Sequence, residues 1–96
     1  MKQHAQRIRY RFVGRVQRRG FRYACMTCAE RANVVGWVKN ERDGSVTAEV
    51  QGEAQDQLLF LQKLTTLVPG YGDGWSIASE QHLELEDGED HFGVRR

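Results

Sequence analysis

Apolar and polar residues alternate strictly over residues 7–14, which is the pattern of a strand with one buried and one exposed side. The apolar positions, which we expect to face the core, are Ile8, Tyr10 and Phe12. The polar positions between them are Arg7, Arg9 and Arg11. We predict that these arginines are solvated, with a basic stripe for a polyanion as the alternative interpretation.

A helix is predicted over residues 21–32, where apolar residues recur at helical spacing. Its apolar stripe consists of Phe21, Cys25, Cys28, Ala29 and Ala32. We expect Tyr23 to anchor the helix on the sheet together with Phe21, and Asn33 to end it. The two cysteines are one helical turn apart on this stripe, so we expect buried thiols rather than a disulfide framework or a zinc site. A redox role for the pair stays open.

Two more strands are predicted at residues 34–38 and 46–50, because valines recur in both and alternate with polar residues in the second. Asp43 and Gly44 lie between these segments. Since both residue types tolerate the positive φ of a tight hairpin turn, we predict that the two strands are antiparallel neighbours.

The rest of the chain predicts one helix and two strands. The helix ends before Pro69 and Gly70. Its apolar face consists of Leu58, Leu61, Leu64, Leu67 and Val68. A glycine-rich loop at residues 70–74 leads to a long strand over residues 75–85, and a short strand follows at residues 92–94.

The order of these elements is strand, helix, strand, strand, helix, strand, with a short strand at the end. Two βαβ-type units around an antiparallel sheet, with both helices on one face, give the split βαβ or ferredoxin-like architecture of the α+β class. We assign the 96 residues to a single domain, residues 1–96. The chain has neither an apolar run near the ~20 residues of a membrane span nor a signal-peptide core, so we expect a soluble cytoplasmic protein without a membrane partner.

Charge is divided unevenly along the chain. Residues 1–42 carry eleven basic and two acidic side chains, whereas residues 43–96 carry three basic and eleven acidic ones. This asymmetry is typical of a nucleic-acid face, of an anion site with an acidic counterpart, or of sequence blocks that interleave on folding. We interpret the acidic residues between positions 84 and 90 as a solvated edge.

The loop at residues 14–22 carries the strongest chemical signal, because it leaves a strand and opens a helix. Gly14 and Gly20 allow a close approach of the backbone, and the helix N-terminus adds a partial positive charge. A Walker loop is excluded, because five residues separate the glycines and Phe21 stands in place of the required lysine. Arg22 adds a planar fork of donors that suits two phosphate oxygens, so we predict an oxyanion pocket.

Two segments of the chain resemble the motifs of the acylphosphatase family. The first motif, G-R-V-Q-G-V-G-F-R in the family, is matched by Gly14, Arg15, Val16, Gln17, Gly20, Phe21 and Arg22. The second motif, G-W-V-x-N-x-x-D-G-x-V, is matched by Gly36, Trp37, Val38, Asn40, Asp43, Gly44 and Val46. The resemblance is clear over residues 7–68 and implies a ferredoxin-like fold in a small, monomeric acylphosphatase.

The resemblance also implies a mechanism, in which an acyl phosphate such as acetyl or carbamoyl phosphate is hydrolysed to a carboxylate and inorganic phosphate. Arg22 then has the phosphate-binding role, and Asn40 orients the attacking water. The phosphate-binding loop comprises Arg15, Val16, Gln17, Arg18, Arg19 and Gly20. Because a carboxylate is a good leaving group, positioning and charge stabilisation suffice, and we expect neither a metal nor a cofactor.

Arg18 and Arg19 depart from the family, which has glycine and valine at these positions. If the first position needs a left-handed backbone, Arg18 costs ~1–2 kcal/mol relative to glycine. The added cations would otherwise attract larger and more charged phosphates. The alternative function is a catalytically weak module that binds an anion or RNA, although we do not expect a nucleic-acid partner. We rank last a domain of a larger protein that handles carbamoyl phosphate.

Overall fold

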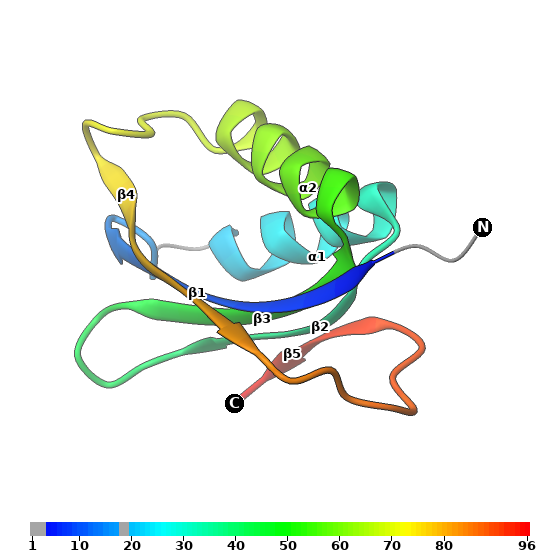
Figure 1. The fold of residues 1–96 in the computed structure, drawn as a ribbon. Helices are drawn as coiled ribbons and strands as arrows, with labels where there is room; N and C mark the ends of the chain where they lie inside the picture. The colour runs from blue at the N-terminus through cyan, green and yellow to red at the C-terminus, as the bar shows by residue number, and fades with distance from the viewer. Residues whose placement is uncertain (1–3, 18–19) are drawn as a thin grey trace.

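Five strands form one sheet, and two helices cover one of its faces (Figure 1). The computed structural model describes residues 4–17 and 20–96. The elements are β1 (Ala5–Gly14), α1 (Phe21–Ala32), β2 (Val35–Asn40), β3 (Val46–Glu53), α2 (Ala54–Leu67), β4 (Trp75–Leu83) and β5 (Phe92–Arg95). The predicted α+β architecture is confirmed. Neither helix in the described part of the chain is long and apolar enough to cross a membrane.

The strands follow the order β4-β1-β3-β2-β5 across the sheet. β1 lies between β3 and β4 and is antiparallel to both. β2 is antiparallel to β3, with Asn40 opposite Val46. The short β5 is parallel to β2, with Phe92 opposite Gly36, so the last strand makes the sheet mixed.

The hairpin between β2 and β3 is confirmed, but its turn is longer than predicted. Five residues, 41–45, connect the strands in place of a two-residue turn, and of the predicted turn pair only Gly44 has a positive φ, of 94°. At the other end of the chain β4 stops at Leu83, two residues before the predicted end, and Leu85 is exposed.

An aromatic cluster in the core fixes both ends of the loop between β1 and α1. The ring of Phe21 makes edge-to-face contacts with Phe12 and Trp75, at centroid distances of 5.4 and 5.3 Å. Phe12 lies two residues before Gly14, and Phe21 directly follows Gly20. The start and the end of the loop are therefore both held against β4.

Helix α1 follows the prediction at its C-terminus and on its buried stripe. Asn33 ends the helix in the left-handed conformation, with a φ of 64°. Cys25 and Cys28 are buried, and burial raises the pKa of both thiols. Tyr23, however, is 59% exposed, so it does not anchor the helix. Two residues beyond Phe21, its side chain points away from the core side of the helix.

The buried face of α2 differs from the prediction. Leu58 and Leu67 are 61% and 49% exposed. Leu64 is buried as predicted, but the other buried residues of the helix are Gln57 and Phe60. The apolar stripe is therefore rotated toward Gln57, a polar residue that the hydrophobic pattern assigns to the surface.

Gln57 is held in the core by three hydrogen bonds. Its Oε1 atom accepts one from the Tyr10 hydroxyl at 2.8 Å. Its Nε2 atom donates to the backbone oxygens of Val50 and Gln6, at 2.7 and 3.1 Å. Because an unpaired buried amide costs ~1–3 kcal/mol, these partners keep Gln57 inside and turn Leu58 toward solvent.

The prediction that Arg7 is solvated is wrong. The residue is 1% exposed, its Nε atom donates to Glu49 at 2.9 Å, and its Nη1 atom donates to Glu89 at 2.7 Å. Arg9 and Arg11 keep nearly half of their side chains exposed. Arg7 is thus buried together with two carboxylate partners. Arg9 pairs with only one of them, Glu49, and Arg11 pairs with neither.

The acidic segment between β4 and β5 is not a solvated edge throughout. Glu89 pairs with Arg7, and the side chain of Gln51 exchanges two hydrogen bonds of 2.9 Å with the backbone of Glu86. The pairs of Arg7 with Glu49 and Glu89 join the acidic second half of the chain to the basic first half. They support the interpretation that the two charge blocks interleave on folding.

Candidate functional site

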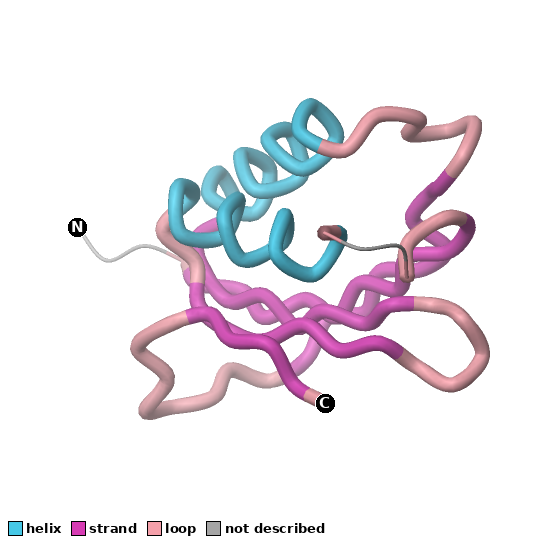
Figure 2. Tube along the Cα trace, turned by 180° about the vertical axis from the view of Figure 1, so that it is seen from behind, coloured by secondary structure: helices cyan, strands magenta, loops and turns pink. Residues whose placement is uncertain are grey.

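One end of the sheet brings together the β1–α1 loop, the start of α1, the β2–β3 loop and the α2–β4 loop (Figure 2). This end lies on the left in Figure 1. The N–H group of Arg15 donates to the backbone oxygen of Gly74 at 2.9 Å. The Nε2 atom of Gln17 donates to the backbone oxygens of Glu41 and Ser45, at 2.5 and 2.7 Å. The predicted phosphate-binding loop is therefore bonded to both other loops.

Gly14 allows the β1–α1 loop to leave the sheet. Its φ is 99°, and a Cβ atom there would lie 2.4 Å from the backbone oxygen of Gly74 and 2.7 Å from the Cα atom of Trp75. The N–H group of Val16 donates to the oxygen of Gly14 at 2.9 Å, and the Val16 side chain is fully buried. The core thus anchors the first half of the loop.

The N-terminus of α1 is suited to an anion. Gly20 precedes the helix with a φ of 94°, no side chain of residues 4–17 or 20–96 caps the helix, and its first turn contains no acidic residue. The first backbone hydrogen bond joins the Ala24 N–H group to the Gly20 oxygen at 2.7 Å. The N–H groups of Phe21, Arg22 and Tyr23 precede that bond, and with the helix dipole they favour a negative charge.

Two arginines flank this N-terminus. Arg22 is half-buried in the first turn of α1, and Arg15 lies at the start of the β1–α1 loop. Neither forms an ion pair with a carboxylate in the part of the chain that the structure describes. The predictions for Arg18 and Arg19 fall outside the described residues.

Asn40 is the last residue of β2 and is half-buried. Its Oδ1 atom is buried and accepts no hydrogen bond from residues 4–17 or 20–96. Unpaired buried acceptors are rare, because each costs ~1–3 kcal/mol. An acceptor held in this way suits a ligand or a water molecule that donates a hydrogen bond to it. Asn40 precedes Glu41, which Gln17 contacts.

The sequence predicts a role for Gln17 in the loop but does not indicate that its side chain bonds to the β2–β3 loop. Asp43 holds that loop in shape, because its carboxylate accepts hydrogen bonds from the N–H group and the hydroxyl of Ser45, at 2.9 and 2.6 Å. These bonds, assisted by Arg11, lower the pKa of Asp43 to about 2. An aspartate two residues before a serine is a recognisable turn signal. No sequence signal places Gln17 opposite this turn.

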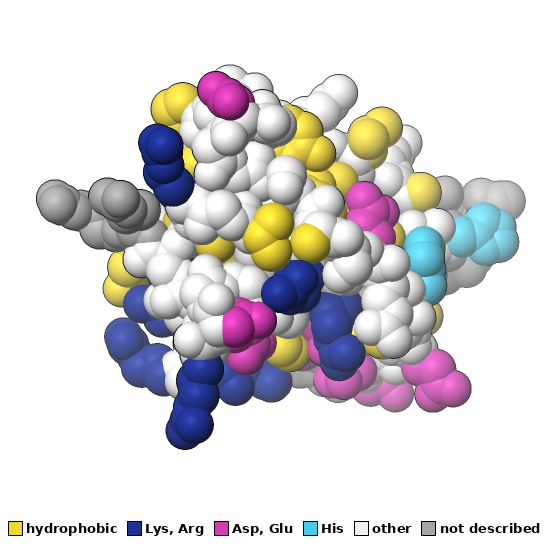
Figure 3. All heavy atoms as spheres, turned by 90° about the vertical axis from the view of Figure 1, so that its left-hand side faces the viewer, with side chains coloured by type: hydrophobic (Ala, Val, Ile, Leu, Met, Phe, Trp, Pro, Cys, Tyr) yellow, Lys and Arg dark blue, Asp and Glu magenta, His cyan; other side chains and the backbone are white. Residues whose placement is uncertain are grey.

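Charged side chains are distributed unevenly on this end of the molecule, which Figure 3 faces. Lys and Arg side chains gather over its lower left part, and Asp and Glu side chains are frequent over its lower right part. Within the described residues, no three His, Cys, Asp or Glu side chains are grouped so that they could hold a metal ion. This end of the sheet offers cations and backbone N–H groups to an anion.

Known proteins share both the sequence pattern and the fold. Residues 8–91 match the family described as Acylphosphatase. A curated protein named Acylphosphatase from Bifidobacterium longum is 37% identical over 98 residues, which cover 100% of each chain. One from Nocardioides sp. is 37% identical over 87 residues, which cover 86% of this chain and 81% of the relative. The crystal structure of acylphosphatase from Bacillus subtilis has a TM-score of 0.78 and 26% identity, over 95% of this chain and 99% of that chain.

Proposed function

The chain belongs to the acylphosphatase family of enzymes, and we propose that it hydrolyses acyl phosphates with Arg22 and Asn40 as its catalytic residues. The Arg22 guanidinium binds the phosphoryl oxygens together with backbone N–H groups at the N-terminus of α1 and in the loop before it. The Oδ1 atom of Asn40 accepts a hydrogen bond from the attacking water and orients it.

The reaction needs little covalent assistance from the protein. The water oxygen forms a bond to phosphorus, the bond from phosphorus to the acyl oxygen breaks, and the carboxylate leaves with the bonding electrons. The proton of the water passes to phosphate or solvent. Because the leaving carboxylate is stable without a proton, the rate depends on in-line positioning and on stabilising the equatorial oxygens. Arg22 and the backbone N–H groups supply that stabilisation.

The observation that carries this proposal is the buried, unpaired Oδ1 atom of Asn40. The fold holds this acceptor next to Glu41, whose backbone oxygen bonds to Gln17 of the phosphate-binding loop. A water molecule bound to Asn40 would therefore lie beside the loop that receives the phosphoryl group. Its attack on phosphorus would then need no large movement of the protein.

Hydrolysis of acetyl phosphate in the presence of EDTA tests the proposal. Arg22→Lys keeps the charge but loses the planar fork, so we expect kcat to fall about 100-fold or more. Asn40→Ala should lower kcat with little change in KM, because orientation of water matters in the transition state. Arg31→Lys replaces an exposed arginine on the same helix and serves as the matched control.

A folded wild-type protein without turnover would contradict the proposal, and binding of an anion or RNA would become the question to pursue. Unchanged activity in Arg22→Lys would show that the Arg22 guanidinium does not bind the phosphoryl oxygens as proposed. If Asn40→Ala raised only KM, the water-orienting role would be wrong. Circular dichroism of each variant separates these results from loss of the fold.

We also propose that the enzyme acts as a cytoplasmic monomer without a cofactor. Arg22, Asn40 and the loop come from one chain, and the two free thiols suit a reducing compartment. Light scattering after gel filtration tests the oligomeric state. Activity that persists after dialysis against EDTA tests the independence from metal.

A further inference from the structure

A groove of about 390 Å³ begins at the phosphate-binding loop and runs between the start of α1 and the end of α2. Arg15 and Gly20 line it at the loop end. Its other walls are mostly apolar and include Tyr23, Ala24, Leu67, Val68 and Pro69. The groove is therefore continuous with the proposed phosphate site.

Two large apolar side chains on the walls of this groove face solvent. Tyr23 is 59% exposed and Leu67 is 49% exposed, although both belong to helices that pack on the sheet. Neither side chain contributes to the core, so the packing of the fold does not account for their residue types. Exposed apolar groups that line a concave surface are typical of a binding site.

The geometry points to this groove as the site for the acyl group of the substrate. The inference rests on the proposed function, because a phosphoryl group at the N-terminus of α1 places the acyl group at the edge of the loop. An apolar chain that enters the groove covers Tyr23 and Leu67, and burial of its methylene groups favours binding. At the loop end, Arg15 faces the carboxylate that leaves. The preferred substrates are therefore acyl phosphates with a short apolar chain, which the enzyme hydrolyses more efficiently than acetyl phosphate.

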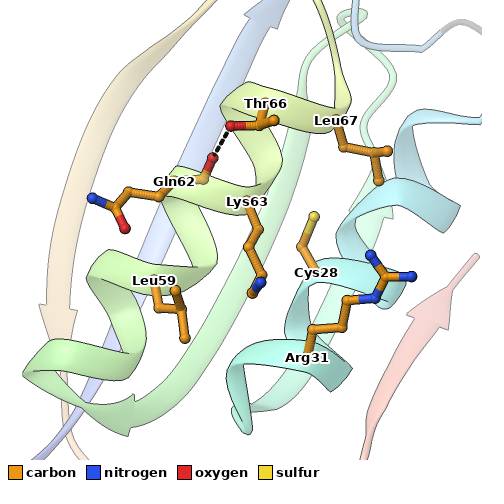
Figure 4. Close-up of a pocket in the computed structure, with 7 residues that line it drawn as sticks. All are labelled: Cys28, Arg31, Leu59, Gln62, Lys63, Thr66 and Leu67. Carbon is orange, nitrogen blue, oxygen red and sulfur yellow. Dashed lines mark hydrogen bonds between the residues drawn. The ribbon is translucent and has the colours of Figure 1, made fainter.

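A second groove sets the length of that acyl group. It has a volume of about 430 Å³, lies between the two helices and shares Leu67 with the first groove (Figure 4). Arg31 and Lys63 line it, and neither pairs with a carboxylate of the described residues. Cations that need water are poor neighbours for a hydrocarbon chain, so the apolar path ends near Leu67.

Hydrolysis of acetyl, hexanoyl and decanoyl phosphate by the intact chain tests the inference. We expect kcat/KM to rise about 10-fold from acetyl to hexanoyl phosphate and to gain nothing further with decanoyl phosphate. Leu67→Ser and Tyr23→Ser should each lower the hexanoyl-to-acetyl ratio of kcat/KM about 5-fold. Leu58→Ser is the matched control, because Leu58 is 61% exposed on the same helix and lines neither groove.

The inference is overturned if wild type shows no preference for hexanoyl over acetyl phosphate, or if Leu67→Ser and Leu58→Ser change the ratio equally. If no acyl phosphate is hydrolysed, the proposed function fails. The groove is then tested by calorimetry, which measures the affinities for hexylphosphonate and methylphosphonate. Tighter binding of hexylphosphonate that Leu67→Ser abolishes supports the groove. Equal affinities for the two phosphonates overturn it.

Discussion

The side-chain amide of Gln17 donates a hydrogen bond of 2.7 Å to the backbone oxygen of Ser45. The same Nε2 atom donates to Glu41, the residue after Asn40. One side chain of the phosphate-binding loop thus fixes the position of the loop relative to the proposed water-orienting residue. In-line attack depends on this relative position, because errors of about 1 Å cost ~100-fold in rate.

Gln17→Ala removes this link without touching the proposed catalytic groups. We expect kcat to fall about 10-fold to 100-fold, while the free energy of unfolding falls by only about 1 kcal/mol. Steady-state kinetics with acetyl phosphate and urea unfolding measure the two effects. Gln55→Ala, at an exposed position of α2, provides the control. A loss of stability without a loss of kcat would show that Gln17 has only a structural role.

Arg7→Ala should destabilise the fold by about 3 kcal/mol, because it leaves the Glu49 carboxylate without its buried partner. Burial alone would raise the pKa of Glu49, but hydrogen bonds from Arg9 and Arg7 outweigh it and hold the pKa below its usual value. Urea unfolding measures the loss, and hydrogen exchange at Glu86 reports release of the β4–β5 segment. Arg11→Ala, which breaks an exposed pair, should cost far less. Equal costs would contradict the importance of burial.

Local pattern predicts which side of β1 enters the core, but it cannot predict the burial of Arg7. Ile8 and Tyr10 are buried as the alternation indicates. The partners of Arg7 are Glu49 and Glu89, which are 42 and 82 residues away along the chain. Only the topology of the sheet brings them together, so a strand pattern that covers eight residues contains no information about them.

In the candidate site, too, local backbone features can be predicted from the sequence, whereas features that depend on distant contacts cannot. Gly14 and Gly20 are recognisable from the sequence, because their backbone conformations are local properties. The groove at Leu67 is not recognisable, because the spacing of leucines places that residue in the core. The hydrogen bonds of Gln57 with β1 and β3 rotate α2 and expose Leu67. The buried polar residue Gln57 thus determines which face of α2 is exposed. Hydrophobic periodicity alone assigns that face to the core.

Acidification should weaken the fold through Asp43. Its pKa in the folded protein is about 2, below the ordinary value of 3.8, so the unfolded chain takes up the proton first as pH falls. The contribution of Asp43 is complete above pH ~4 and disappears between pH ~4 and ~2. The urea midpoints of wild type and Asp43→Asn should therefore differ at pH 5 and converge by pH 2.

The exposed Asp73 in the α2–β4 loop is the control for this measurement. No described residue donates a side-chain or backbone hydrogen bond to its carboxylate. At pH 5 the urea midpoint of Asp73→Asn should stay close to that of wild type. If the difference between wild type and Asp43→Asn stayed constant down to pH 2, the hydrogen bonds from Ser45 would not stabilise the carboxylate.

Substitution of two glycines should separate backbone strain from steric exclusion. Gly14 and Gly72 both have positive φ, of 99° and 88°, so alanine costs ~1–2 kcal/mol at either position. At Gly72 a Cβ atom would meet no atom of the described residues within 4 Å, whereas at Gly14 it would meet the backbone oxygen of Gly74 at 2.4 Å. Gly14→Ala should therefore cost about 1–3 kcal/mol more than Gly72→Ala in urea unfolding. It should also weaken the affinity for inorganic phosphate, since the start of the phosphate-binding loop must move. Equal effects of the two substitutions on stability and phosphate affinity would show that the contact between Gly14 and Gly74 does not position the loop.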